Sequence, residues 1–349
     1  MQISSILRDW YQSNHRELPW RQTRDSYRIW LSEIILQQTR VAQGLDYYLR
    51  FVEHYPTVND LSQAPLDDVL KLWQGLGYYS RARNLHKAAQ LVCERFFDDR
   101  GEARFPTAYA DLLRLPGVGP YTAAAIASFS SGEAVAVVDG NVYRVLSRLF
   151  DIATPIDSSE GQKLFQVLAQ EQLDPQHAGE HNQAIMEFGA LQCTPASPDC
   201  SQCPLSDQCA ALAAKTVDAR PVKAGKVKVR ERHLHYYLFK YKENLWVHQR
   251  QAGDIWQGLW EFVPEELLPS SLLDSSDHSS PLVGTERGFS VKHQLTHQLL
   301  HIDFCLVELS HPICIADCEQ ISWADWQKKA VPKPISEANR RFSVIFGKK

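Results

Sequence analysis

Four of the eight cysteines in this chain of 349 residues lie in one short run, CTPASPDCSQCPLSDQC, at positions 193 to 209. The run is rich in Pro and Ser and is too polar to form a hydrophobic core. Thiolates at this spacing can fold a short loop around one metal centre. Four thiolates suit a structural zinc ion or a four-iron, four-sulfur cluster, and ligand chemistry alone does not choose between them. The sequence therefore predicts a metal site formed by Cys193, Cys200, Cys203 and Cys209.

Two carboxyl groups lie in sequence surroundings that favour opposite protonation states. Glu33 is flanked on its predicted helix by Trp30 and Ile34, and poor solvation there favours a protonated general acid. Asp139 ends the apolar run VAVVD and precedes a helix beginning near Val142, whose unpaired N–H groups stabilise an anion. One acid and one carboxylate suit the cleavage of a glycosidic bond through a cationic sugar. The alternatives are a simple helix cap at Asp139 and a solvated helix residue at Glu33.

Two Gly-x-Gly turns could contact nucleic acid. In LPGVGPYTAAAIASF, residues 115–129, Gly117 and Gly119 precede an Ala-rich helix whose first N–H groups can bind a phosphate oxygen. GLGYYSRARNLHK, residues 75–87, adds two tyrosines and three basic residues, which can wedge between bases and bind phosphates. An ordinary connection between helices is the alternative for each turn.

Composition limits the class of protein. The chain is 44% hydrophobic and 22% charged with a formal net charge of -4, which favours a soluble globular protein of two domains rather than a DNA-binding polycation. The N-terminus lacks the pattern of a signal peptide, and no apolar run approaches the roughly 18 residues of a membrane span. We therefore expect a cytoplasmic protein without a membrane partner, in which structural disulfides are rare.

The predicted elements divide the chain into two domains. Residues 1–215 carry apolar residues at helical spacing almost throughout, and the basic, Pro- and Gly-containing residues 216–232 are typical of a linker. Residues 233–349 predict a smaller α/β domain, with strands in HYYLFKY, NLWVHQR and LLHIDFCLVEL and a final helix in SEANRRFSVIF. A Ser-rich loop is expected over residues 269–281.

Taken together, these motifs resemble a known family. The C-x6-C-x2-C-x5-C run, the LPGVGxxTA turn and the apolar-Asp-Gly-Asn segment resemble the helix-hairpin-helix DNA glycosylases of the endonuclease III superfamily. LPWR, LSEIILQQT, GLGYYSRARNLHKAA and the C-terminal domain are similar, more narrowly, to the MutY family of adenine DNA glycosylases. The resemblance spans nearly the whole chain and implies a helical glycosylase fold with an iron-sulfur cluster loop, followed by a MutT-like (Nudix-like) domain.

The resemblance also implies a cofactor, a substrate and a setting. The four cysteines would hold a [4Fe-4S] cluster, and a bacterial monomer would act on duplex DNA. Its substrate would be adenine mispaired with 8-oxoguanine or guanine, removed by hydrolysis of the N-glycosidic bond to leave an abasic site. A base inside the stack must first be extruded from the duplex.

Roles for individual residues follow from the same resemblance. Glu33 matches the general acid that protonates adenine at N7 and later handles water, and Asp139 matches the carboxylate that stabilises or captures the oxocarbenium ion. Asn141 matches a hydrogen-bonding helper, and Tyr121 a tyrosine placed beside these groups in some members. The matches for the adenine pocket are Trp20, Arg21 and Gln183. The matches for DNA contacts are Gln38, Tyr78, Gly117, Val118 and Gly119, and those for the 8-oxoguanine strand are Leu295, Thr296 and His297.

Three features refine these expectations. Strand-cutting relatives carry a lysine where this chain has Tyr121, and tyrosine cannot form a Schiff base, so we expect a monofunctional glycosylase. The C-terminal half lacks the Glu-dense R-E-x-x-E-E helix that would hold magnesium, so it should bind rather than hydrolyse. Leu295-Thr296-His297 stands where the family usually has Phe-Ser-His, which weakens that match, and an ordinary turn before a strand is its alternative.

Two other functions remain open at this stage. A cluster-stabilised protein that binds damaged DNA without catalysis would need only the turns and the cysteines. An endonuclease III type enzyme for oxidised pyrimidines is disfavoured by Tyr121 and by the additional domain.

Overall fold

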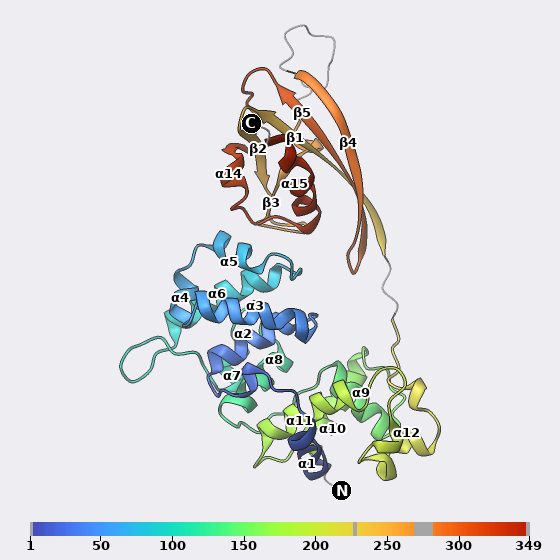
Figure 1. Ribbon diagram of the computed structural model, residues 1–349. Coiled ribbons are helices and arrows are strands. Elements are labelled where there is room, and N and C mark those ends of the chain that lie inside the picture. The colour runs from blue at the N-terminus through green and yellow to red at the C-terminus, as the bar shows by residue number, and fades with distance from the viewer. Residues whose placement is uncertain (1–2, 226–228, 269–281, 347–349) are drawn as a thin grey trace. The chain divides into compact units, whose positions relative to one another are not determined.

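A computed structural model of the chain describes residues 3–225, 229–268 and 282–346, without the side chains of 282–287 (Figure 1). The chain forms two compact units, Met1–Gln63 with Asn84–Lys226, and Ala64–Arg83 with Val227–Lys349. The Ser-rich loop predicted at 269–281 lies outside the described residues. Among the described residues, no helix is both long enough and apolar enough to cross a membrane.

The first unit is almost entirely helical, as the sequence predicts. Its helices are α1 (Ser4–Asn14), α2 (Ser26–Leu36), α3 (Val41–His54), α4 (Val58–Gln63), α6 (Ser80–Arg95), which begins in the second unit, α7 (Tyr109–Leu112), α8 (Pro120–Ser130), α9 (Gly140–Leu149), α10 (Ser159–Gln172), α11 (Ala178–Leu191) and α12 (Ala210–Ala213), with the short 3₁₀ turns η1 (Pro19–Arg21), η2 (Cys200–Gln202), η3 (Ser206–Gln208) and η4 (Val217–Ala219).

Local signals fix the helix starts that matter for the site. The Asp25 side chain caps α2 by accepting from the backbone N–H of Tyr27 at 2.9 Å. Pro120 occupies the first turn of α8, where a backbone N–H would have no partner within the helix, so the missing N–H of proline costs nothing. Gly117 has φ +78°, and a Cβ there would lie 2.8 Å from the Cβ of Asn84. The turn before α8 therefore requires glycine.

The core of the first unit holds the helices that carry the candidate site. Helix α11 packs against α1, α8 and α9, and α2 packs against α8. Leu7, Ala125, Leu146, Phe165 and Phe188 are buried in this core. Residues more than a hundred positions apart in the sequence are thereby held in one rigid arrangement.

The second unit contains a six-stranded mixed sheet in the order β4-β5-β1-β3-β2-β6. Strands β1 and β5 are parallel, and the other neighbours are antiparallel. The elements are α5 (Leu66–Trp73), β1 (Arg230–Tyr241), β2 (Asn244–Gln249), β3 (Trp260–Pro264), η5 (Glu265–Leu267), β4 (Leu282–Gln294), β5 (Gln298–Leu309), β6 (Cys318–Ser322), α14 (Trp323–Trp326) and α15 (Lys333–Phe346).

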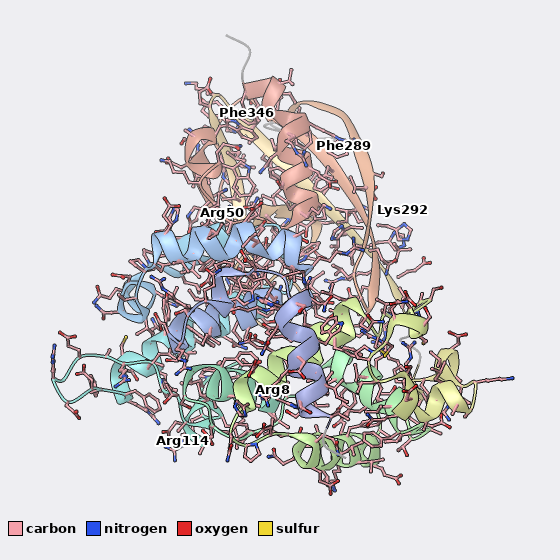
Figure 2. The ribbon with its side chains drawn as sticks, turned by 60° about the horizontal axis from the view of Figure 1, so that its bottom comes forward. Arg8, Arg50, Arg114, Phe289, Lys292 and Phe346 are labelled. Atoms are coloured by element: carbon pink, nitrogen blue, oxygen red, sulfur yellow. The ribbon has the colours of Figure 1, made fainter. Side chains whose placement is uncertain are left out.

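Alternation along the strands divides the sheet into two faces. Leu300, Ile302, Phe304 and Leu306 are buried, as their spacing predicts, and the ring of Phe342 on α15 packs against this core. Phe289 on β4 and Phe346 at the end of α15 belong to the same apolar layer (Figure 2). The opposite face carries a smaller apolar cluster and, near the start of β1, polar side chains.

The second unit also includes residues 64–83, which the sequence analysis assigns to the first domain. Asp67 accepts a hydrogen bond from the Trp260 indole at 3.3 Å. The ammonium of Lys71 donates to the carbonyls of Gln327 and Lys329 at 2.7 and 2.8 Å. These contacts join segments about 190 and 256 residues apart, a separation that helical periodicity cannot reveal. Strand β1 begins at Arg230, three residues before the predicted domain start.

Candidate active site

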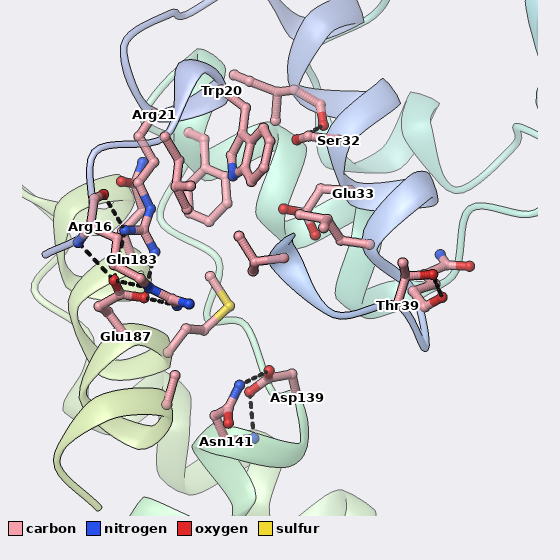
Figure 3. A pocket seen from close by; sticks show the side chains of 18 of the residues that line it. Arg16, Trp20, Arg21, Ser32, Glu33, Thr39, Asp139, Asn141, Gln183 and Glu187 are labelled. Atoms are coloured by element: carbon pink, nitrogen blue, oxygen red, sulfur yellow. Dashed lines mark hydrogen bonds and ion pairs between the residues drawn. The ribbon is translucent and has the colours of Figure 1, made fainter. Parts of the chain in front are cut away.

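One pocket of about 450 Å³ in the first unit contains both carboxyl groups singled out in the sequence (Figure 3). This volume is typical of a small-molecule site, roughly 300–1,000 Å³. Glu33 reaches it from α2 and Asp139 from the start of α9. The other predicted residues that line it are Trp20, Arg21, Gln38, Tyr121, Asn141 and Gln183.

Glu33 is 9% exposed, and its environment favours the protonated form. Burial raises the pKa of Glu33 to about 7, and the nearby charge of Asp139 also raises it. The hydroxyl of Tyr121 and the charge of Arg21 act in the opposite direction on this pKa. Close to neutral pH, a substantial fraction of the Glu33 side chains therefore carries a proton that can be donated.

Asp139 is the N-cap of α9. Its Oδ1 accepts from the backbone N–H groups of Asn141 and Val142 at 2.9 and 2.8 Å, and its Oδ2 accepts from the Asn141 amide at 2.8 Å. Burial raises the pKa of Asp139, and this effect outweighs the hydrogen bonds, which act to lower it. The cap that the sequence predicts is present, but burial opposes the stabilisation of the anion that the cap argument alone predicts.

A buried arginine holds Asn141 in place beside Asp139. Arg144 donates to the Oδ1 of Asn141 at 2.8 Å and to the Gly189 carbonyl at 2.5 Å. Its Nε donates to the carbonyl of Cys193 at 2.7 Å. The amide of Asn141 is thereby oriented with its nitrogen toward Asp139. The same arginine connects this carboxylate to the first residue of the cysteine run.

The opposite wall of the pocket contains a third carboxylate, Glu187, which the sequence analysis misses. Arg21 donates to both oxygens of Glu187 at 2.9 and 2.7 Å, and Arg16 donates to them at 2.8 and 2.6 Å. Burial acts to raise the pKa of Glu187, but the hydrogen bonds from Arg16 and Arg21 outweigh it and lower this pKa. Glu187 is therefore a stable anion that fixes the guanidinium of Arg21 (Figure 3).

The remaining predicted pocket residues also have fixed positions. The Trp20 ring packs edge-on against the ring of Tyr48, with centroids 5.1 Å apart. The Gln183 carbonyl oxygen accepts from the hydroxyl of Tyr11 at 2.7 Å, which leaves its amide group to donate. An aromatic surface and amide and guanidinium groups at the wall suit a flat, polar, uncharged ring such as a nucleobase.

Tyr121 enters the pocket from the first turn of α8. Its hydroxyl lies 3.5 Å from the sulfur of Met186. Burial raises the pKa of Tyr121 well above 10, and the charges of Glu33 and Asp139 add to this rise. The phenol is therefore neutral at physiological pH and can act only through hydrogen bonds.

The predicted DNA-contact residues occupy turns in both units. In the first unit, Gln38 has φ 57° in the turn after α2, and Gly117, Val118 and Gly119 form the turn before α8. In the second unit, Tyr78 has φ 46° and is 49% exposed. Gln38 and Tyr78 thus have a positive φ, whereas residues other than glycine usually have a negative φ.

Tyr78 also meets the loop predicted to read the 8-oxoguanine strand. Leu295, Thr296 and His297 connect β4 to β5. The hydroxyls of Tyr78 and Thr296 form a hydrogen bond. Leu295 packs against the sheet core, whereas Thr296 and His297 are exposed.

The four cysteines of the run line one small cavity and form no disulfide. The guanidinium of Arg148 lies 3.4 Å from the sulfur of Cys193, and the Cys209 thiol donates to the Arg148 carbonyl at 3.4 Å. Cys200 and Cys203 complete the set. Four thiols around one cavity supply the type of ligand that a structural metal ion or an iron-sulfur cluster requires.

Comparison with protein families gives two matches. Residues 31–171 match the HhH-GPD superfamily of base excision DNA repair proteins, and residues 235–341 match the NUDIX domain. An adenine DNA glycosylase of Buchnera aphidicola subsp. Schizaphis graminum is 35% identical over 312 residues, which cover 88% of each chain. The Homo sapiens adenine DNA glycosylase is 46% identical over 214 residues, which cover 59% of this chain and 38% of that protein.

Solved structures agree with the first family. A thermostable thymine-DNA glycosylase is similar with a TM-score of 0.55 and 30% identity, over 61% of this chain and 95% of that chain. The fold is also that of an endonuclease III in a non-covalent complex with DNA, with a TM-score of 0.51 and 24% identity, over 61% and 94% of the two chains.

Proposed function

Because this chain belongs to the adenine DNA glycosylase family of helix-hairpin-helix base excision repair proteins, we propose that it excises adenine mispaired with 8-oxoguanine or guanine in duplex DNA. The reaction hydrolyses the N-glycosidic bond of an extruded nucleotide and leaves an abasic site. One observation carries the proposal: Glu33 and Asp139 line the same pocket, and within the described ranges backbone N–H groups lower the pKa of Asp139 but not that of Glu33.

Glu33 acts as the general acid. With a pKa of about 7 it holds a proton near neutrality and delivers it to N7 of adenine, so that the base leaves as a neutral molecule. The carboxylate that remains can then accept a proton from the attacking water. A positioned acid of matched pKa typically contributes about 10²–10⁴-fold to the rate.

Asp139 stabilises the sugar cation that forms as the base departs. The ionised form receives three hydrogen bonds from Asn141 and Val142, which hold both oxygens in a fixed place. Developing positive charge at the anomeric carbon is then met by an oriented anion. Asn141, itself held by Arg144, is the positioning residue for this carboxylate.

The wall formed by Trp20, Arg21 and Gln183 receives the extruded adenine. The indole of Trp20 offers apolar contact to the base, and Gln183 and Arg21 offer hydrogen-bond donors. Glu187 is paired with both Arg16 and Arg21 and so offsets part of the guanidinium charge beside the base. The proton that Glu33 transfers is then the only charge that the base gains before it leaves.

Tyr121 makes the enzyme monofunctional. A lyase needs a neutral amine to attack the sugar, and the buried phenol of Tyr121 stays neutral and forms no Schiff base. Borohydride should therefore trap little enzyme on the DNA. Abundant covalent product would instead indicate an endonuclease III type reaction.

The predicted turns supply the DNA contacts. In the turn Gly117-Val118-Gly119, the N–H of Val118 donates to the Leu115 carbonyl at 3.1 Å, and the N–H groups of the two glycines bind phosphate at the start of α8. Gln38 and Tyr78 enter the duplex. Thr296, paired with the hydroxyl of Tyr78, recognises the 8-oxoguanine strand together with Leu295 and His297.

Cys193, Cys200, Cys203 and Cys209 would hold a [4Fe-4S] cluster. The cluster supplies a rigid centre to a loop that has no apolar core. Arg148 donates toward the sulfur of Cys193 and to the carbonyls of Thr194 and Pro195, which orders the backbone between the first two ligands.

A single-turnover assay tests the proposal. Enzyme in excess is incubated with a duplex that holds adenine opposite 8-oxoguanine, and the DNA is then heated in alkali. We expect scission at the adenine, and a loss of about 10²-fold or more in Asp139→Asn. Asp157→Asn is a matched control, because Asp157 also accepts from two backbone N–H groups, those of Ala224 and Gly225, but is exposed outside the pocket.

Three outcomes distinguish the alternatives. Scission that survives in Asp139→Asn contradicts the assigned role of this carboxylate. Binding without scission in the unmodified protein favours a non-catalytic damage-binding protein. Scission before alkali treatment favours a bifunctional enzyme.

A further inference from the structure

The polar face of the sheet in the second unit carries two histidines and a glutamate that the proposed reaction does not use. In the parallel pair of β1 and β5, His233 lies in register with His301. Glu231 is two residues before His233 and so projects from the same face. The next residues on each strand, Leu234 and Ile302, are buried on the opposite face. We call Glu231, His233 and His301 the histidine group.

The side chains of the histidine group converge. One ligand atom from each of the three lies within 4.8 Å of the other two. The imidazole rings of His233 and His301 are stacked, with centroids 4.7 Å apart and planes inclined by 12°. The Nε2 of His301 lies 3.5 Å from a carboxylate oxygen of Glu231.

One atom in this group has an unmet requirement. The Nε2 of His301 is buried and has no hydrogen-bond partner among the described residues, and the approach of Glu231 is too long for a good hydrogen bond. A buried polar atom without a partner typically costs about 1–3 kcal/mol and calls for an explanation. A ligand at this nitrogen would remove the cost.

The charged neighbours leave room for a cation. Asp303 on β5 forms an ion pair with His235 at 3.3 Å, one register step further along the same face. Lys292 on β4 is in register with His301 but is exposed (Figure 2). Within the described part of this face, Glu231 is thus the carboxylate beside the two imidazole rings, Asp303 is paired with His235 one step further along, and the ammonium of Lys292 is solvated.

We propose that Glu231, His233 and His301 bind a zinc ion. Two imidazole nitrogens and one carboxylate oxygen form the ligand set of an open tetrahedral zinc site, in which water takes the fourth position. Zinc–nitrogen bonds of about 2.0–2.1 Å place the ligand atoms about 3.3–3.5 Å apart. The ligand atoms now lie within 4.8 Å of one another, so zinc binding requires the side chains to turn toward a common centre.

Bound zinc would cross-link the starts of strands β1 and β5. Glu231 and His233 belong to the first four residues of β1, and His301 to the first four of β5. The site consists of nitrogen and oxygen ligands, so its metal preference differs from that of the four thiols. Zinc would therefore stabilise the start of β1 independently of the proposed cluster.

Metal analysis of the full chain tests the proposal. Protein with its cluster loaded and without a histidine tag is dialysed against buffered zinc, and zinc and iron are measured together. In the parent protein, we expect one zinc ion per chain in addition to the iron of the cluster. The double variant His233→Asn/His301→Asn should bind no zinc, and Glu231→Gln should bind zinc at least tenfold more weakly. His311→Asn, which removes an exposed histidine outside the group, should retain the zinc.

Cobalt identifies the ligands. Co²⁺ bound in place of zinc should show the visible bands of a tetrahedral site without a thiolate-to-metal charge-transfer band, since the histidine group contains no sulfur. A strong thiolate band, or a zinc content that is unchanged in the double variant, would overturn the proposal. If the double variant does not fold, two measurements still test the proposal. These are the cobalt spectrum of the parent protein and the zinc affinity of Glu231→Gln, which changes an exposed residue.

Discussion

Glu33 in the helical unit and Glu261 in the sheet unit are both buried, 9% and 1% exposed, but their surroundings differ. Glu261 accepts from the hydroxyl of Tyr236 and from Arg250, both at 2.7 Å, and faces His248 at 3.1 Å. For Glu33, no ion pair with an arginine or lysine is found among the described residues, and burial dominates its pKa. A buried carboxylate with charged partners is part of the structure, whereas one without a charged partner in contact is poised to exchange a proton.

Glu187 shows that the pocket itself does not prevent a carboxylate from being paired. It lines the same cavity as Glu33, but Arg16 and Arg21 hold it ionised and its pKa is lowered. Burial alone therefore does not distinguish a functional carboxylate from a structural one in this molecule. The number of charged donors around each group does.

The largest effect should follow from Glu33→Gln. Without the acid, we expect the single-turnover rate of adenine excision to fall by about 10³-fold. The free energy of unfolding at about pH 8 should not decrease, because the substitution removes a carboxylate that burial disfavours in its charged form. Rate assays and urea unfolding of the same protein check both halves. A variant that loses stability together with activity would place Glu33 with the structural carboxylates.

Glu261→Gln should have the converse effect. It leaves Arg250 buried beside an uncharged amide, and the free energy of unfolding should fall by about 3 kcal/mol. The excision rate of the folded protein should change little, because Glu261 lies outside the reaction pocket. Glu308→Gln is the matched control, since it breaks a pair with Lys240 that is only partly buried and should cost less, about 1 kcal/mol. Equal losses in the two variants would contradict the comparison.

The sequence predicts the local parts of this contrast. The apolar neighbours of Glu33 and the helix that follows Asp139 lie within a few residues, and the structure has both the burial and the cap. The alternation along β5 likewise predicts which residues face the core. These signals are readable because they depend on periodicity and on the geometry of a single turn.

The pairing partners could not be predicted in the same way. Arg16 and Arg21 reach Glu187 across 171 and 166 residues, and the register of β1 with β5 brings together His233 and His301. No periodic pattern in one segment reports a contact made by another segment so distant. The sequence therefore predicts which side chains are buried better than which of them are satisfied.

The raised pKa of Glu33 should make the stability of the protein depend on pH. The pKa of Glu33 is raised from 4.5 to about 7, so the folded state binds a proton more tightly than the unfolded state. The associated stability is present below about pH 4.5 and is lost as pH rises through about 7. Between about pH 5.5 and pH 8, the stability of the parent relative to Glu33→Gln should fall by about 2 kcal/mol.

The excision rate should show the same ionisation. Above about pH 7 it should fall nearly tenfold per pH unit, because the acid form of Glu33 is depleted. Paired measurements of unfolding and of single-turnover rate across this range check the assignment. A rate that rises through pH 8 would mean that another group donates the proton.

The smallest effect should follow from Tyr121→Phe, which changes one partner of Glu33 and leaves its burial intact. The hydroxyl of Tyr121 lowers the pKa of Glu33 by hydrogen bonding to it. Its removal should raise that pKa and shift the alkaline limb of the rate profile upward by about half to one pH unit. Tyr143→Phe, on α9 but outside the pocket lining, should leave the limb in place. If the limb of Tyr121→Phe moves to lower pH, the hydroxyl stabilises the protonated acid instead, and Glu33 has no donor that favours its charge.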